Sequence, residues 1–273
     1  MSYRTILLEL VDDPQNDPRI ECGRRLAVQF GAELVGIHVS PPPFIPVGFG
    51  EGAVYVGPEI FEAQREASRL VRERVEAAFR RLCDPARMAV RDVYEEGDPG
   101  TVIAEAARGA DLTLVAQEGG SGTDSLAPQP IHHIILSAGG PVLMLPRTGL
   151  RDVIGRHAAV AWNGSREAAR AVKDALPFLV AAEAVTLIAA GEEAAASLDA
   201  ITAMLKRHGA PAEAKQVDTG RGAGATLLTA AAAAGADLLV MGAYGHSRLR
   251  EIVLGGATRE VLHGAQLPVL LSC

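Results

Sequence analysis

The chain has 273 residues, of which 48% are hydrophobic and only 4% aromatic, and its formal net charge is −7. This length favours two domains, whose cores must be built mainly from aliphatic side chains. An acidic chain without a clustered Lys/Arg patch argues against a nucleic-acid partner, and no apolar stretch is long enough to span a membrane.

The N-terminus and the cysteines are typical of a cytoplasmic protein. The first ten residues, MSYRTILLEL, carry charges too early and too short an apolar run for a signal peptide. Cys22, Cys83 and Cys273 are far apart and odd in number, without disulfide-framework or zinc-site spacing. We therefore expect reduced thiols in the cytoplasm.

Strands and helices are predicted to alternate along the first half of the chain. Buried or alternating apolar runs predict strands, and helical spacing of apolar residues predicts helices. The predicted strands cover residues 5–11, 33–39, 88–94, 111–116 and 141–145. The predicted helices cover residues 18–30, 59–83, 99–108 and 126–138. A Gly/Pro-rich insert at residues 41–58 predicts a long loop that is either mobile or a cover.

The same order begins again after a predicted linker at residues 146–155. The predicted strands of this half cover residues 158–162, 184–189, 214–218, 237–241 and 267–271. The predicted helices cover residues 165–180, 192–208, 226–234 and 251–264.

Two short segments repeat between the halves. Gly-Ala-Asp-Leu at residues 109–112 recurs at 235–238, and Pro-Val-Leu at 141–143 recurs at 268–270. Such matches at corresponding places indicate duplication. We predict two tandem doubly wound α/β domains, residues 1–147 and 155–273. Each should contain a five-stranded, mainly parallel sheet with helices on both faces.

The fourth predicted strand of the second half runs into a glycine-punctuated loop. Gly242, Gly245, Gly255 and Gly256 follow the strand, and a helical pattern comes next. Glycines allow positive φ and close approach of a ligand, while free N–H groups at a helix start favour an anion. Asn163 follows the first strand of this half, and ligands in such sheets bind at the carboxyl ends of strands. The pattern predicts a phosphate-binding loop.

These residues resemble the nucleotide-binding motif of the universal stress protein family. In that family Gly-x2-Gly-x9-Gly, followed by Ser or Thr, comes after the fourth strand of a five-stranded α/β domain. Gly242, Gly245 and Gly255 match this spacing, and the duplication is similar to that of tandem members. The resemblance implies a stress-response protein whose second domain binds an adenine nucleotide, ATP, with Mg²⁺ held mainly by its phosphates.

Two positions depart from the family's pattern. Gly256 stands where the motif has Ser or Thr, and Thr258 is the nearby hydroxyl that could substitute. Asn163 stands where binding members usually carry Asp, so that hydrogen-bonding reach is kept and the charge is lost.

The candidate site combines strand ends, the glycine loop and the start of the next helix. Its members are Asn163, Met241, Gly242, Gly245, His246, Arg248, Gly255, Gly256, Ala257 and Thr258. His246 and Arg248 would supply positive charge to a polyphosphate, although they also fit a solvated loop. The histidines lack ligand spacing, so no metal site built from protein ligands alone is predicted.

The first half has lost the motif. Ala116 replaces the first glycine, Gly119 remains, and Pro128, which has no N–H to offer a phosphate, stands at the place of Gly255. We therefore expect one intact site at most, and a structural or regulatory role for the first half.

A second glycine-rich stretch, residues 220–225, resembles a dinucleotide fingerprint. It follows the third strand of its unit rather than the first, and Asp237 is expected to start the next strand, out of reach of a ribose. A plain glycine-rich turn is the preferred interpretation.

Several functions remain open from the sequence. No nucleophile and base are paired by spacing, so we expect regulatory ATP binding rather than turnover, with slow hydrolysis left open. One alternative is a nucleotide-free interaction module with protein partners. Another is an adenine-nucleotide enzyme on a related fold. The resemblance also implies association through the last strand of each domain, giving an intramolecular pseudo-dimer that could form a homodimer.

Overall fold

The computed structural model of the chain describes residues 2–43, 58–83, 88–118, 130–190, 192–217, 222–245 and 256–273. Its strands are β1 (Thr5–Glu9), β2 (Glu33–Ser40), β3 (Val90–Glu96), β4 (Leu112–Ala116), β5 (Val142–Leu145), β6 (His157–Trp162), β7 (Ala184–Ala190), β8 (Ala212–Val217), β9 (Leu238–Gly242) and β10 (Val269–Ser272). Its helices are α1 (Asn16–Phe30), α2 (Pro58–Leu82), α3 (Pro99–Ala107), α4 (Pro130–Ser137), α5 (Arg166–Asp174), α6 (Leu176–Ala181), α7 (Glu192–Ala195), α8 (Leu198–Arg207), α9 (Ala223–Ala233) and α10 (Gly256–Gly264).

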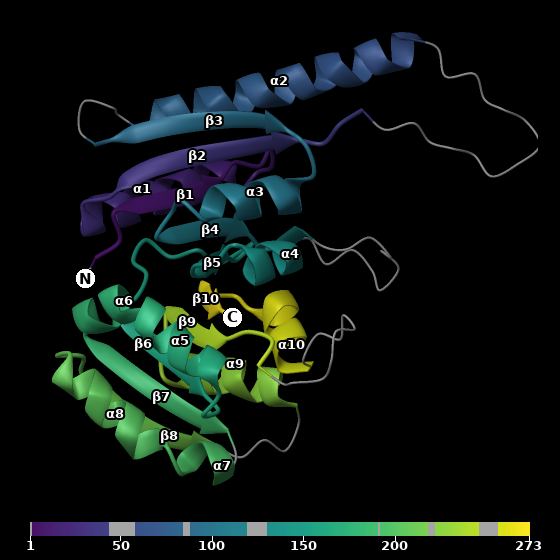
Figure 1. Cartoon of the computed structure of the whole chain (residues 1–273). Coiled ribbons are helices and arrows are strands. Elements are labelled where there is room, and N and C mark those ends of the chain that lie inside the picture. The colour runs from purple at the N-terminus through teal and green to yellow at the C-terminus, as the bar shows by residue number, and fades with distance from the viewer. Residues whose placement is uncertain are drawn as a thin grey trace, which may run out of the picture.

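The strands form one ten-stranded sheet in the order β3-β2-β1-β4-β5-β10-β9-β6-β7-β8 (Figure 1). Within each half all neighbouring strands are parallel and follow the same order, which confirms the predicted fold class. The halves meet where β5 and β10 pair antiparallel, with Leu143 opposite Leu270. The last strands of the two halves thus pair with each other, as the resemblance implies.

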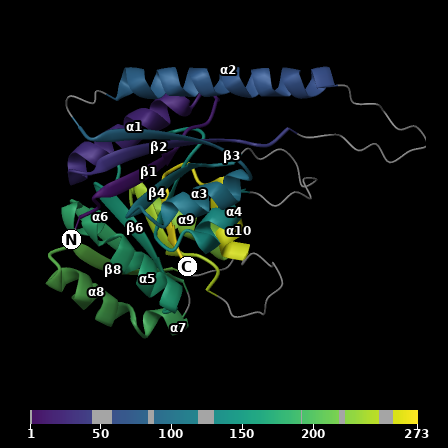
Figure 2. The ribbon, with the colours of Figure 1, turned by 45° about the horizontal axis from the view of Figure 1, so that its top comes forward.

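Helices cover both faces of the sheet (Figures 1 and 2). Successive strand residues point to opposite faces, so Ile6 and Leu8 enter one core and Leu7 enters the other. The first core also contains residues of α1, α2, α5, α6 and α8, and the second contains residues of α3, α4, α9 and α10. This arrangement leaves the strand ends of each half open at the rim of the sheet.

The repeated aspartates have a structural role at the amino ends of the strands. Asp111 accepts hydrogen bonds from the backbone N–H groups of Arg4 (2.7 Å) and Thr5 (2.9 Å). Asp237 is buried and accepts one from Gly155 N at 2.7 Å. Each aspartate therefore ties the start of its half's fourth strand to the start of the first strand. As expected, Asp237 precedes β9 rather than ending it.

Two predicted helices are divided. The helix predicted at residues 165–180 is α5 followed by α6, because Pro177 has no N–H for an internal helical bond and instead lies in the first turn of α6. The helix predicted at residues 192–208 is likewise α7 and α8, interrupted at residues 196–197.

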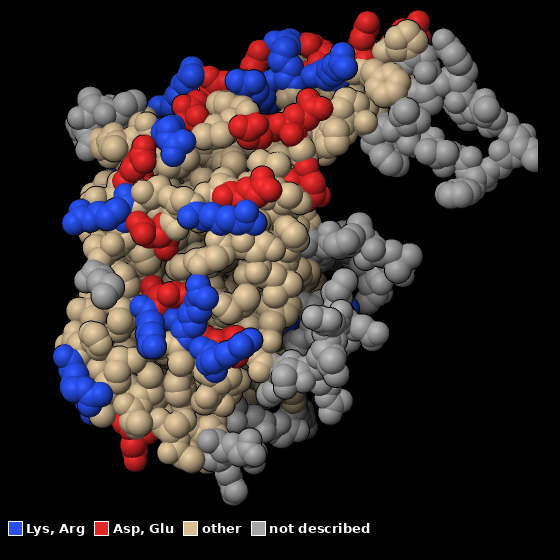
Figure 3. All heavy atoms as spheres, viewed as in Figure 1, with Lys and Arg blue, Asp and Glu red and all other residues tan. Residues whose placement is uncertain are grey.

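Helix α2 runs along the outer end of the first half (Figures 1 and 2). Only Val75 and Phe79 are buried among its residues. Its solvent side carries ion pairs of Arg69 with Glu66 and Glu73, and Figure 3 shows positive and negative side chains alternating over it. None of the described helices is long and apolar enough to cross a membrane.

Candidate functional site

The carboxyl ends of β6, β9 and β10 bring several predicted site residues to one rim. Ala161 pairs with Met241, and Ser272 pairs with Gly242, so the segments that leave these strands are neighbours. Asn163 and Gly242 therefore lie at the same edge of the sheet. His246, Arg248 and Gly255 fall outside the described residues.

The remaining predicted site residues differ in how far they are exposed to solvent. Met241 is buried in the core, so only its backbone is available at the rim. Gly256 is exposed and opens α10, and Ala257 is half-buried behind it. Thr258 is only 5% exposed, so its hydroxyl belongs to the buried side of α10. A hydroxyl buried there is poorly placed to replace the Ser or Thr hydroxyl of the family's motif.

Close packing against α5 requires glycine at positions 242 and 245. A Cβ atom on Gly242 would lie 2.4 Å from the backbone nitrogen of Ala168 in α5. A Cβ atom on Gly245 would lie 3.0 Å from Oε2 of Glu167 and 3.2 Å from Oγ of Ser165. The end of β9 thus passes against the first turn of α5, which only glycine permits. The glycines are visible in the sequence, but their packing against the first turn of α5 is not.

The turn between β6 and α5 engages the side chain of Asn163. Its Oδ1 accepts a hydrogen bond from Ser165 N at 3.1 Å, across Gly164 with φ of +74°. Ser165 in turn caps α5, since its Oγ accepts from Ala168 N at 3.1 Å. The Asn163 side chain therefore has a local role besides any contact with a ligand.

A buried carboxylate lies beneath this turn. Burial disfavours the charged form of Glu167. The hydrogen bond and charge of Arg166, together with hydrogen bonds from the Glu167 backbone and from Ser165, outweigh burial and hold the pKa of the carboxyl below its usual value. The Arg166 side chain is almost fully exposed. The pair therefore presents its positive member to solvent beside the glycine loop.

Tyr244 departs from the usual backbone conformation. Its φ is +62°, in the left-handed region that non-glycine residues rarely adopt. Its hydroxyl lies 2.8 Å from Nδ1 of His132 in α4, and the two rings meet edge to face at 6.5 Å. A helix of the first half thus contacts the glycine loop of the second half.

The corresponding rim of the first half is filled by carboxyl groups. The strand registers place Glu9 where Ala161 stands in the second half. Oε2 of Glu9 accepts from Ala116 N at the end of β4, and Oε1 of Glu118 accepts from Ile131 N at the start of α4, both at 2.8 Å. Burial raises the pKa of both carboxyls. Main-chain donors that could meet a ligand are therefore already paired.

The glycine-rich stretch at residues 220–225 leads into a helix whose start is bound by a side chain of the protein itself. Residues 218–221 are outside the described part, but α9 begins directly after Gly222. A Cβ atom on Gly224 would lie 2.7 Å from the carbonyl oxygen of Ala257, so this glycine allows α9 to pack on α10. Oε2 of Glu260 accepts from Ala225 N at 3.0 Å. A protein carboxylate at this helix start supports the plain-turn interpretation.

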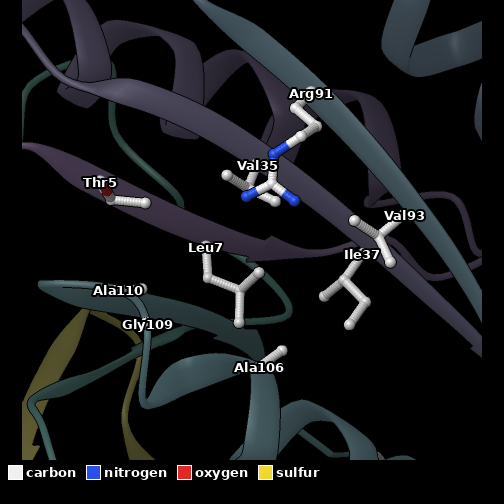
Figure 4. Close-up of a pocket in the computed structure, with 9 residues that line it drawn as sticks. All are labelled: Thr5, Leu7, Val35, Ile37, Arg91, Val93, Ala106, Gly109 and Ala110. Atoms are coloured by element: carbon white, nitrogen blue, oxygen red, sulfur yellow. The ribbon is translucent and has the colours of Figure 1, made fainter.

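A cavity of about 200 Å³ lies elsewhere, in the first half (Figure 4). Leu7, Val35, Ile37 and Val93 form its apolar lining, and the guanidinium group of Arg91 lies over it. None of the predicted site residues lines it. Among the described residues, no three ligand side chains gather in a way that could hold a metal ion.

Comparisons with known proteins fit this fold and this rim. The family model described as Universal stress protein family matches residues 179–272, which include β9, the glycine loop and α10. A universal stress protein of Synechocystis is 56% identical over 34 residues, a match that spans 12% of this chain and 12% of that protein.

Two solved structures resemble nearly the whole chain. A universal stress protein from Archaeoglobus fulgidus has a TM-score of 0.75 at 16% identity, over 98% of this chain and 95% of its own. A protein of unknown function from Pseudomonas aeruginosa has a TM-score of 0.61 at 16% identity, over 99% and 92%. At these identities the likeness shows the fold, a tandem pair of five-stranded α/β halves. The family match, which is confined to residues 179–272, makes the second half of the chain similar to universal stress proteins.

Proposed function

We propose that the second half binds an adenine nucleotide, with ATP as the leading ligand, in a regulatory role within the stress response. The observation that supports this most is the start of α10. Gly256 is exposed there, and among the described residues a Cβ atom on it would meet nothing within 4 Å. Free N–H groups at a helix start attract a phosphate.

The starts of α4 and α9 differ from the start of α10 in their side-chain partners. Glu118 accepts from the first turn of α4, and Glu260 accepts from the first turn of α9. Within the part of the chain that the structure describes, no side chain accepts from the first turn of α10. An anion from solution would complete α10 as protein carboxylates complete the others.

The other groups would divide between the two ends of the nucleotide. Asn163 and the backbone of Met241 would meet the adenosine, and the backbone of Gly242, Gly245 and Gly256 would meet ribose and phosphates. Magnesium would be held mainly by those phosphates. The proposed role is binding rather than turnover, because no base is paired with a nucleophile among the residues that the structure describes. Domain boundaries near residues 147 and 155 and a cytoplasmic location are part of the same proposal.

The test is calorimetry with ATP and Mg²⁺ on the full chain and on two variants of Gly256. Gly256→Glu places a negative charge before α10 in open space, where it suits the helix dipole but repels a polyphosphate. We expect one ATP per wild-type chain and at least about tenfold weaker binding in this variant. Gly256→Gln, of the same size without the charge, should bind within about threefold of wild type. No binding heat in wild type would overturn the proposal.

A second candidate is a nucleotide-free interaction module that acts on a protein partner. The packing of Gly242 and Gly245 against α5 favours it, since this packing explains both glycines without a ligand. Ultraviolet absorbance of the extract from denatured, freshly purified protein separates the two. Adenine nucleotide released in proportion to protein excludes the ligand-free module.

A further inference from the structure

We infer that His132 of the first half is a positioning residue for the nucleotide site of the second half, acting through Tyr244. This inference rests on the proposed function. It gives the degenerate first half a specific task, which is to hold the start of the glycine loop in a conformation that the loop's own sequence disfavours.

The backbone before Tyr244 is already fixed. Ala243 N donates to the carbonyl oxygen of Ser272 at 2.8 Å, and Gly242 is pressed against the first turn of α5. At Tyr244 the chain turns away with φ of +62°. An L residue with a Cβ resists this conformation, so something must hold it there.

His132 is the group that holds it. The Tyr244 hydroxyl is 2.8 Å from His132 Nδ1, and the two rings lie edge to face. Both side chains are half-buried between the halves. The neighbouring His133 is exposed on the same helix and provides a matched control.

The protonation states of the two side chains allow the Tyr244 hydroxyl to donate to His132. Burial raises the pKa of Tyr244, so its hydroxyl keeps its proton and can donate. Burial, together with His263 and Arg259 of α10, lowers the pKa of His132, so its ring is neutral near pH 7 and Nδ1 can accept. Glu118 and Cys273 are the other titratable groups that face Tyr244. When His132 is protonated, Nδ1 carries a proton and can only donate, so the bond then runs from Nδ1 to the Tyr244 hydroxyl oxygen.

The first experiment measures ATP affinity of full-length variants against pH. His132→Leu and Tyr244→Phe should each weaken binding by about three- to tenfold, as expected for one hydrogen bond, and the double variant should be no weaker than either. His132→Asn places an amide oxygen near the position of Nδ1, so it should restore affinity. If the affinity of wild type changes as the pH falls through the lowered pKa of His132, that change should be absent in His132→Asn. His133→Leu should behave as wild type.

The second experiment needs no nucleotide. Backbone amide hydrogen exchange at residues 243–245 should be faster in His132→Leu than in wild type and unchanged in His133→Leu. If wild type binds no ATP, the proposed function fails while this measurement still tests the positioning. If wild type binds ATP and His132→Leu matches it in affinity and in exchange, the positioning role is refuted. Additive effects of the two single changes would refute it as well.

Discussion

Among single residues, the glycines after β9 separate into two kinds. Gly242 is required by the backbone of α5, whereas Gly256 faces open space. We predict that Gly242→Ala lowers the free energy of unfolding by about 1–3 kcal/mol, because the new Cβ would overlap the Ala168 backbone nitrogen. Urea unfolding measures this difference. Gly256→Ala is the control, and it should stay within about 0.5 kcal/mol of wild type. Equal losses in both variants would contradict this account.

The Glu9 carboxyl makes the stability of the fold depend on pH. Its pKa is raised by burial, so the native state binds its proton more tightly than the unfolded chain does. Its contribution to stability is present below the unfolded pKa and is lost as the pH rises through the native pKa. We predict that Glu9→Gln, which keeps an oxygen for Ala116 N, raises the unfolding free energy at neutral pH and has little effect at acid pH.

Thermal unfolding across a pH series tests this sign, with the exposed Glu105→Gln as the control. A Glu9→Gln variant that is less stable than wild type at neutral pH, or equally affected at all pH values, would show that the charged carboxylate is favourable where it lies.

Sequence patterns identify residues whose role is local. Ser165 is predicted as an N-cap from its place before a helix, and the structure confirms it. His132 and Tyr244 are 112 residues apart in the sequence, and the residues next to them form no pattern that predicts their contact. The occupation of the first-half rim by Glu9 depends on the register of two strands, which a single sequence does not provide. The candidate site could thus be proposed from sequence, but the side-chain contacts around it could not be predicted.

Among the secondary-structure elements, the strands are predicted most closely. Each is a buried aliphatic run or an alternating segment bounded by Gly, Pro or Asp, and these signals depend on few residues. The helices are less well predicted where they break. Pro177 signals the end of α5 in the sequence, yet helical spacing continues through it into α6 and hides the break.

Helix starts carry the proposed function at the scale of the elements. The starts of α4, α9 and α10 differ in which side chains bind them. Carboxylates of Glu118 and Glu260 complete α4 and α9, whereas none of the described side chains accepts from the first turn of α10. The difference comes from side chains on neighbouring elements, not from the helix sequences themselves.

At the scale of the whole molecule, the interface between the two halves should make them unfold together in one transition. Leu143 is fully buried in β5 and faces Leu270, while Tyr3, Phe30 and Phe178 form an aromatic cluster in which the Tyr3 hydroxyl donates to the Asp174 carbonyl at 2.7 Å. We predict one calorimetric transition for wild type. Leu143→Lys buries an unpaired charge and should lower the unfolding free energy by about 4 kcal/mol or more.

The control is Leu136→Lys on the outer side of α4, where the leucine is 52% exposed. This variant should unfold as wild type does. Two separate transitions in wild type would show that the halves are independent units despite the continuous sheet.

The β5–β10 pairing has a consequence for how the protein responds to its own abundance. Two separate chains joined through the same strands would come apart on dilution, and any contact between them would weaken as expression falls. Here both strands belong to one polypeptide, so each presents the other with a fixed local concentration. The contact from His132 to Tyr244 is therefore formed equally in a cell with few copies and in one with many. A response that depends on this contact would not vary with the amount of protein in the cell.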